Sequence, residues 1–312
     1  MRQQSTAGMR RIPGGAFTMG SELFYPEERP LRRVRVEDFW IDETPVTNRQ
    51  FAEFVEATGY RTFVEIAPDP RDYPGLAPEA AMAGSLVFQR TATPVPLDDF
   101  GQWWAFVAGA DWRHPTGPES DADPDHPVVH VAFADAEAYA AWAGKALPTE
   151  AEFEFAARGG REGAEYAWGD ELAPGGATLA NYWQGLFPFA NQRADGGYRT
   201  TPVGSYPANG YGLHDMIGNV WEWTRDWYSV PKSVRPARGK SPCCAIPDPR
   251  GGNLRGSVDP AQPGVPLGRK VLKGGSHLCA ANYCQRYRPA ARHAQSIDSA
   301  TSHIGFRCVV RG

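Results

Sequence analysis

Apolar positions follow a helical period most clearly in residues 47–58. Thr47 or Asn48 can cap the start of this helix, and Gly59 can end it in a left-handed turn. The apolar residues recur three and four positions apart, which places them on one face. They are Phe51, Phe54 and Val55. We therefore predict an amphipathic helix whose apolar face lies in the core.

A second helical region, residues 134–160, is predicted to hold two helices. Asp135 is the expected cap of the first helix, and Gly144 is expected to end it. Thr149 followed by Glu152 forms a capping box, in which each side chain can bond the backbone N–H of the other residue. This pair predicts the start of the second helix.

Strand patterns are short and widely spaced. Runs rich in β-branched and aromatic residues predict strands at 16–19, 33–41, 128–133, 269–273 and 305–310. Long stretches rich in Gly, Pro and Trp separate them, at 62–127, 160–220 and 229–268. We expect one α+β domain with little regular secondary structure, formed by residues 9–312 after a short or disordered tail at 1–8. The ten Trp and twelve Tyr side chains are expected to fill its core.

The charge of the chain argues against several classes of protein. The formal net charge is −4, so the chain has no basic footprint for nucleic acid. No apolar run approaches the ~20 residues of a membrane-spanning helix. The first residues also lack the apolar run of a signal peptide. We expect a cytoplasmic monomer with no nucleic-acid or membrane partner.

Two of the five cysteines, Cys279 and Cys284, lie between a glycine pair and an arginine-rich stretch. Two soft thiolates with no third sulfur or imidazole at metal spacing suit Cu(I) better than zinc. On one helix the two side chains would be rotated by ~140°. In a strand they would be ~16 Å apart. The segment must therefore curl for both sulfurs to reach one ion. The alternatives are a disulfide and two buried thiols without a role.

The other cysteines are given no functional role. Cys243 and Cys244 are adjacent in a loop, where a bridge between them would be strained, although an opportunistic bond is not excluded. Cys308 lies in an apolar terminal segment and is expected to be a small core residue. The chain has no G-x-G-x-x-G sequence that opens a helix after a strand, so no flavin or nicotinamide site is predicted.

Several motifs occur in a characteristic order along the chain. They lie at residues 12–20, 45–48, 147–154, 209–213, 218–223, 273–276 and 305–308. Together they resemble the formylglycine-generating enzyme family, also called the sulfatase-modifying factors, from about residue 9 to 310. The segment 109–118 looks like one typical of the true formylglycine-generating enzymes. Pro45 is a departure, because many relatives carry Glu there, and the extra disulfide cysteines of secreted relatives are absent.

This resemblance implies a variant of the C-type lectin fold and a copper-dependent oxidoreductase. The implied reaction oxidises the cysteine of a Cys-x-Pro-x-Arg motif in an unfolded sulfatase polypeptide to Cα-formylglycine, with O₂ as co-substrate and Cu(I) bound by the two cysteines. The implied catalytic residues are Cys279, Cys284, Ser276 and Tyr283. Ser276 can equally satisfy the backbone of its loop.

Substrate-binding residues are expected in an extended groove. Trp168 is expected to form a wall of the pocket, with a core position as the alternative. Arg113 and His114 are expected to bind substrate or to hold the shape of the groove, and a structural salt bridge is equally consistent with the sequence. Asp72 is a weak candidate for the carboxylate that pairs with the substrate arginine.

Two oxygen-rich segments are expected to bind structural Ca²⁺, because calcium prefers carboxylate and carbonyl ligands. By resemblance, the first set comprises Asp215, the Gly218 and Val220 carbonyls, and Glu222. The second set comprises Asn181, the Tyr182 carbonyl, Asp195 and the Gly197 carbonyl. The alternative is that the acids are solvated or ion-paired.

Two other functions remain consistent with the sequence. One is a non-catalytic module on the same fold that binds a peptide or a sugar. The other is an oxidase that uses the two thiols without a metal. Replacing either cysteine distinguishes the binding module from an oxidase, because only an oxidase depends on the thiols. An assay with and without Cu(I) distinguishes the metal-free oxidase from the copper enzyme.

Overall fold

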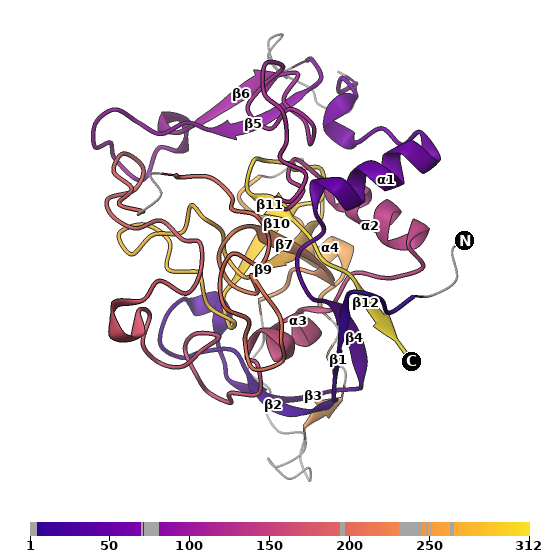
Figure 1. Ribbon diagram of the computed structural model, residues 1–312, viewed down its shortest axis with the longest axis vertical. Helices are drawn as coiled ribbons and strands as arrows, with labels where there is room; N and C mark the ends of the chain where they lie inside the picture. The colour runs from indigo at the N-terminus through magenta and orange to yellow at the C-terminus, as the bar shows by residue number, and fades with distance from the viewer. Residues whose placement is uncertain are drawn as a thin grey trace.

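The structure of the protein is a computed structural model, and it describes residues 5–69, 71, 81–193, 197–230, 245–247, 249, 251–262 and 265–312. Its central sheet has the strand order β10-β9-β7-β11 (Figure 1). These strands are β7 (Trp221–Trp227), β9 (Arg269–Lys273), β10 (Arg292–Ser296) and β11 (Ile304–Gly305). β9 pairs antiparallel with both β7 and β10, and β11 pairs parallel with β7.

A second sheet joins strands from the beginning and the end of the chain (Figure 1). Its strands, in the order β1-β4-β12, are β1 (Met9–Ile12), β4 (Phe39–Asp42) and β12 (Val309–Arg311). A third sheet, β2-β3-β8, consists of β2 (Gly15–Met19), β3 (Arg32–Val36) and β8 (Ile246–Pro247). The predicted strand 33–41 is therefore two strands in different sheets, and the predicted strand 305–310 is likewise divided between β11 and β12.

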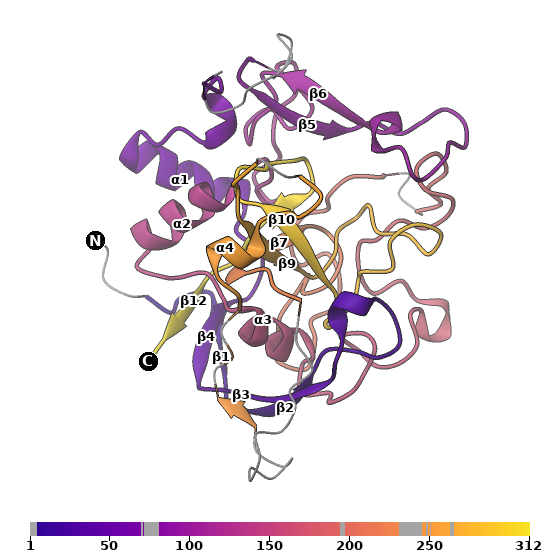
Figure 2. The ribbon, with the colours of Figure 1, turned by 180° about the vertical axis from the view of Figure 1, so that it is seen from behind.

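The hairpin of β5 (Gly84–Phe88) and β6 (Trp104–Ala108) projects from one end of the molecule (Figures 1 and 2). It lies within the stretch 62–127, for which the sequence predicted no strand. Its antiparallel register pairs Gly84 with Ala108 and Phe88 with Trp104. Fifteen residues separate the strands, so no short turn motif indicated the pairing.

Two of the predicted helices are confirmed with their caps. In α1 (Asn48–Thr58), the Thr47 hydroxyl accepts the Gln50 N–H, and Gly59 has φ of 68°. In α3 (Glu150–Ala157), the Glu152 N–H donates to Thr149 Oγ1 at 3.1 Å, and the Glu152 carboxylate accepts the Thr149 N–H at 2.7 Å. Local capping chemistry was thus sufficient to define both starts.

The helix α2 (Phe133–Trp142) corrects two sequence predictions. Its N-cap is Ala132, and Asp135 is the third helical residue, from which its carboxylate accepts the Ala132 N–H at 2.8 Å. Residues 128–133 do not form a strand. His130 has φ of 59°, which breaks an extended conformation, and Phe133 already begins the helix.

The remaining helical elements among the described residues are single turns. They are η1 (Pro26–Glu28), η2 (Phe63–Glu65), η4 (Phe100–Gln102), η5 (Pro174–Gly176) and α4 (Leu254–Ser257). Among the described residues, none of the helices is long and apolar enough to cross a bilayer.

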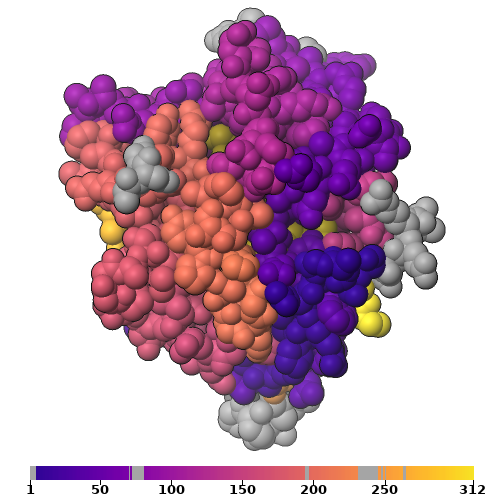
Figure 3. Space-filling model, in the orientation of Figure 1, coloured from indigo at the N-terminus to yellow at the C-terminus, as the bar shows by residue number. Residues whose placement is uncertain are grey.

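Aromatic rings fill the core between α1, α2 and the central sheet. Phe51 lies at the centre, with its ring 5.1 Å from Trp112, 5.9 Å from Tyr139 and 6.4 Å from Phe306. A second core cluster lies around α3, which contacts β9 and β7 on one side and β2 and β3 on the other. On the face shown in Figure 3, the loops between α3 and β7 (pink to orange) cover much of the surface.

Candidate active site

The two cysteines lie in the connection between the adjacent strands β9 and β10. Lys273 at the end of β9 pairs in register with Arg292 at the start of β10, so the chain leaves and returns at one point of the sheet. Gly275 has φ of 75°, and a Cβ atom there would lie 2.6 Å from the Arg286 carbonyl oxygen. Glycine is required at this position because only it allows the two ends of the loop to approach so closely.

Within this loop the chain turns twice and brings the sulfurs together. The Cys279 N–H donates to the Ser276 carbonyl at 3.0 Å, and the Cys284 N–H donates to the Ala280 carbonyl at 2.9 Å. The two Sγ atoms are 3.2 Å apart, and both cysteines are free thiols. The expected curl of this segment is therefore confirmed. Cys279 is 2% exposed, whereas Cys284 is partly exposed.

The two sulfurs differ in charge as well as in exposure. The hydrogen bond with Cys279 lowers the pKa of Cys284 to about 7, with a further contribution from the Arg286 guanidinium 3.8 Å away, while burial opposes both. Burial, followed by the hydrogen bond to Cys284, raises the pKa of Cys279. At neutral pH the arrangement favours a thiolate at Cys284 that accepts a hydrogen bond from the Cys279 thiol.

This difference predicts selective modification of Cys284 in the reduced, metal-free protein. A thiolate is the reactive form of cysteine, so the rate of alkylation should rise with pH around a midpoint below that of an ordinary cysteine. Iodoacetamide labelling followed by peptide mass spectrometry measures this midpoint. Cys308 is a control within the same chain, because burial raises its pKa and it is fully buried. A midpoint near that of an ordinary cysteine, or equal labelling of Cys308, would contradict the assignment.

Ser276 and Tyr283 lie in the same loop as the cysteines. The Ser276 N–H donates to Cys279 Sγ at 3.5 Å, while its hydroxyl oxygen accepts the Leu278 N–H at 3.2 Å, which is the backbone role that the sequence left open. The Tyr283 ring stacks on Phe187 with centroids 4.5 Å apart. Burial, followed by the charges of the two cysteines, raises the pKa of Tyr283. Its phenol therefore keeps its proton at neutral pH.

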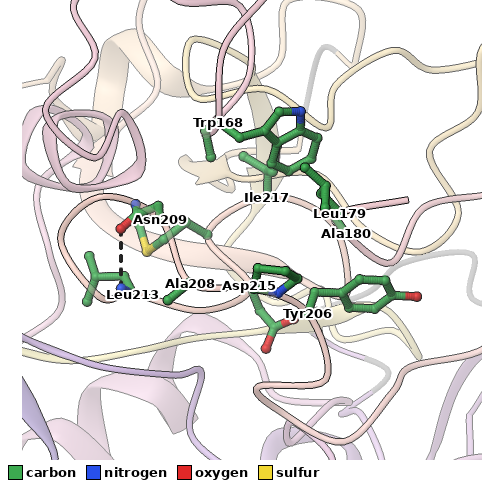
Figure 4. Close-up of a pocket in the computed structure, with 12 residues that line it drawn as sticks. Trp168, Leu179, Ala180, Tyr206, Ala208, Asn209, Leu213, Asp215 and Ile217 are labelled. Atoms are coloured by element: carbon green, nitrogen blue, oxygen red, sulfur yellow. Dashed lines mark hydrogen bonds between the residues drawn. The ribbon is translucent and has the colours of Figure 1, made fainter. Parts of the chain in front are cut away.

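Trp168 lines a cavity of roughly 400 Å³, a volume that includes open space around the cavity. In Figure 4, Trp168 and Ile217 lie on one side of the cavity, and Tyr206 and Asp215 lie on the other. The Trp168 ring stacks on Tyr166, and its Nε1–H donates to the Glu171 carbonyl at 2.8 Å. Trp168 is thus a cavity wall fixed by its neighbours, and its contact with substrate remains a prediction.

Arg113 and His114 form contacts that hold their own segment in shape. Arg113 Nη1 is 2.8 Å from Glu65 Oε1, and its guanidinium lies 4.2 Å from the Trp112 ring centroid. His114 Nδ1 is 2.6 Å from the Ser120 carbonyl oxygen. The sequence allowed either substrate binding or structural contacts for these two residues, and the contacts found here are structural. Asp72 lies outside the described residues, as do Cys243 and Cys244.

Comparison with known proteins gives the family. The whole chain, residues 1–312, matches the family described as the Sulfatase-modifying factor enzyme 1-like domain. The chain belongs to the sulfatase-modifying factor family. It is 54% identical over 300 residues to a protein named Formylglycine-generating enzyme from Mycobacterium tuberculosis, with 96% of each chain covered. It is 47% identical over 318 residues to the protein of that name from Streptomyces coelicolor, with 98% of this chain and 90% of the other covered.

The fold of the family is also found in more distant solved structures. The structure of PvdO from Pseudomonas aeruginosa aligns with a TM-score of 0.61 at 23% identity, covering 96% of this chain and 93% of the other. This likeness shows the fold alone. The α+β domain with few helices, which the sequence predicted as a variant of the C-type lectin fold, is thereby confirmed.

One part of the site could not be found from the sequence. The turn η1 and the residues before it lie against the segment that follows Cys284. Glu27 pairs with Arg286 at 2.6 Å, and Glu28 pairs with Arg288 through two hydrogen bonds, the longer of 2.9 Å. About 260 residues separate these partners in the sequence. The opposite charges of the two segments were the only available clue, and they do not identify a partner.

In the first calcium set, Asp215 is the residue whose surroundings fit a bound cation. Three buried carboxylates, Asp42, Asp215 and Glu222, interact here with two cations, Arg307 and Lys145. Both Glu222 oxygens accept hydrogen bonds from Arg307 at 2.8 Å. Asp215 Oδ1 is buried and has no hydrogen-bond partner among the described residues. Burial raises the pKa of Asp215 although the Arg307 charge opposes this, so a further cation at the carboxylate would favour its ionised form.

The second calcium set fits less well in the part that is described. Asn181 is fully buried, and its Oδ1 already accepts a hydrogen bond from the Arg193 guanidinium at 2.8 Å. That guanidinium also donates to the Arg199 carbonyl at 2.9 Å. A cationic side chain therefore engages the oxygen that calcium would need. Tyr182 and Gly197 are described, whereas Asp195 is not. In the described ranges no cluster of three or more His, Cys, Asp or Glu side chains is placed to hold a metal ion.

Proposed function

We propose that this chain oxidises the cysteine of a Cys-x-Pro-x-Arg motif, in an unfolded sulfatase polypeptide, to Cα-formylglycine. The observation that carries the proposal is the pair of free sulfurs 3.2 Å apart, one buried and one partly exposed, in a curled loop. Support also comes from two relatives named Formylglycine-generating enzyme, each of which this chain covers almost completely.

We further propose that Cys279 and Cys284 hold one Cu(I). The fit is chemical, because thiolate sulfur is a soft ligand that selects Cu(I), and two convergent sulfurs suit a metal that accepts two ligands. When bound, copper would supply the activation of O₂ that amino-acid side chains alone do not provide. Cys279 would anchor the metal from the buried side, and Cys284 would face the entering substrate.

The reaction removes two electrons and two protons from the CH₂–SH group of the substrate cysteine, and O₂ accepts them. Water then adds to the resulting C=S group, which releases hydrogen sulfide and leaves the aldehyde. Tyr283 would donate a hydrogen bond near the sulfurs, because its raised pKa keeps the phenol protonated. Ser276 would fix the position of Cys279 through its backbone N–H.

Substrate binding is proposed to extend from the thiol loop toward the cavity at Trp168. The Trp168 indole is held on its rear side by Tyr166, so it offers a fixed apolar wall. Arg113 and His114 would shape the groove, and Asp72 would pair with the substrate arginine. The chain is proposed to act as a cytoplasmic monomer, which rests on the sequence alone.

A Ca²⁺ ion at Asp215 is proposed to stabilise the fold, with the Gly218 and Val220 carbonyls as further ligands. Glu222 would join them only by exchanging its two Arg307 hydrogen bonds for the metal. Because burial raises the pKa of Asp215, its ionised form lowers stability at neutral pH, and a bound cation would offset this cost. Calcium should raise the melting temperature at pH 7 and have less effect as Asp215 becomes protonated in acid. Differential scanning fluorimetry with and without a chelator measures both.

Asp215→Asn is the variant that tests this calcium site, with Asp170→Asn as a control. Asp170 is an exposed acid that caps a nearby loop by accepting the Glu165 N–H. The Asp215 variant should lose most of the calcium response, and the control should keep it. A response that survives in Asp215→Asn would assign the calcium elsewhere.

The function itself is tested with a Cys-x-Pro-x-Arg peptide and the reduced protein. We expect an aldehyde, detected with an aminooxy probe and by the mass change from CH₂–SH to CH=O, only when copper and O₂ are both present. A peptide with serine in place of cysteine should remain unchanged. Conversion without copper would favour the metal-free dithiol oxidase. Peptide binding without any conversion would favour the binding module.

A further inference from the structure

A segment near the N-terminus braces the residues that follow Cys284. The Gln285 N–H donates to the Tyr25 hydroxyl oxygen at 3.0 Å, which fixes the backbone directly after the cysteine. The Arg286 guanidinium lies 3.8 Å from the centroid of the Tyr25 ring. Such a stack favours a cation in a defined orientation. Residues 24–28, here called the brace, therefore determine where the charge of Arg286 lies.

Arg286 makes three contacts at once. Its Nη2 donates to Glu27 Oε1 at 2.6 Å, its Nη1 lies 3.8 Å from Cys284 Sγ, and its plane rests on Tyr25. The Arg286 and Glu27 side chains are only about one fifth exposed, at 20% and 19%. A largely buried ion pair of this kind holds its geometry better than a surface pair. The guanidinium is thus fixed beside the more exposed of the two sulfurs.

Arg288 lies only two residues after Arg286, but it has a different role. Arg288 donates to both carboxylate oxygens of Glu28, and both side chains are at most 1% exposed. Its guanidinium lies 3.6 Å from the centroid of the Phe24 ring. Arg288 is therefore part of the buried framework, whereas Arg286 directs one nitrogen at a sulfur.

The Arg286 guanidinium lies beside sulfurs that would carry negative charge when copper is bound. Two thiolates and one Cu(I) carry a net charge of −1, and a thiolate from the substrate would make it −2. Accumulated negative charge opposes the entry of another anion unless a cation lies nearby. We propose that Arg286, held by Glu27 and Tyr25, is a positioning residue that stabilises the anionic sulfur centre and favours entry of the substrate thiolate. This inference rests on the proposed binding of Cu(I) by the two cysteines.

Arg286→Gln is the first test, because glutamine removes the charge and retains a polar side chain. Arg286→Met is a second neutral variant, to be used if the first folds poorly. Arg286→Lys restores the charge. Arg29→Gln is the matched control, since Arg29 belongs to an exposed pair with Glu22 at 3.8 Å. Cu(I) affinity is measured by competition with a chromophoric Cu(I) chelator. Copper-loaded proteins are then compared for binding of a Cys-x-Pro-x-Arg peptide and of its serine analogue.

We expect the neutral variants to bind Cu(I) about 10- to 100-fold more weakly than the parent and to lose much of the preference for the cysteine peptide. Arg286→Lys should recover part of both, and Arg29→Gln should match the parent. If the parent binds Cu(I) and both neutral variants bind it equally well with unchanged peptide preference, the inference is wrong while the copper proposal stands. A parent that binds no Cu(I) overturns the copper proposal and this inference with it.

Discussion

Replacing either Cys279 or Cys284 with serine is expected to lower formylglycine formation by roughly 10³-fold or more. The serine hydroxyl is a poor ligand for Cu(I), and a single remaining thiolate cannot hold the metal between two sulfurs. The two variants should be about equally inactive, because the sulfurs act as a unit at 3.2 Å. Aldehyde formation on the peptide and copper content after gel filtration measure the two effects.

Cys308→Ala is the control for these variants. Cys308 is fully buried in the same aromatic core, but its backbone N–H bonds to Asp42 and its sulfur is not part of the pair. This variant should lose a little stability and keep its copper and its rate. If Cys279→Ser or Cys284→Ser kept both activity and copper, the assignment of the thiol pair as the working centre would fail.

Arg288→Met is expected to lower the free energy of unfolding by about 3–5 kcal/mol. It leaves the Glu28 carboxylate buried without its bidentate partner, and neither side chain of the pair is more than 1% exposed. The double variant Glu28→Leu with Arg288→Met should recover much of this loss, because it removes both buried charges together. Urea unfolding followed by tryptophan fluorescence measures all three proteins.

Arg29→Gln again provides the surface comparison, and we expect a change of about 0.5 kcal/mol or less. A single Arg288→Met variant as stable as the parent would show that the brace does not depend on this pair. Loss of stability in Arg288→Met, together with weaker copper binding in Arg286→Gln, would separate the structural role of one arginine from the proposed role of the other.

Elements defined by local chemistry could be predicted from the sequence. The cap candidates Thr47 and Asn48 and the capping box at Thr149 located the starts of α1 and α3, because cap contacts join residues only a few positions apart. Asp135 was assigned to the right helix and the wrong position, since an acid can bond the first free N–H from inside the first turn as well as from the cap.

Elements defined by distant partners could not be predicted in the same way. β7 and β10 were missed because they are strands through pairing with distant segments. Both pair with β9, and β7 also pairs with β11. β10 carries arginine, histidine and glutamine rather than an apolar pattern. The curl at Cys279 and Cys284 was predicted, because neither a helix nor a strand would let both sulfurs bind the same ion. The contacts of Glu27 and Tyr25 with Arg286 and Gln285 required the fold, which brings together segments about 260 residues apart.

The most direct test of the central claim is a stepwise titration of Cu(I) into the reduced, metal-free protein, with aldehyde formation on the Cys-x-Pro-x-Arg peptide measured at each step. We predict that the rate rises in proportion to copper and stops rising at one Cu(I) per chain. Cys279→Ser and Cys284→Ser should remain at the background rate throughout. A parent rate that is already maximal before copper is added, or that rises equally in the serine variants, would contradict a copper centre at these two sulfurs.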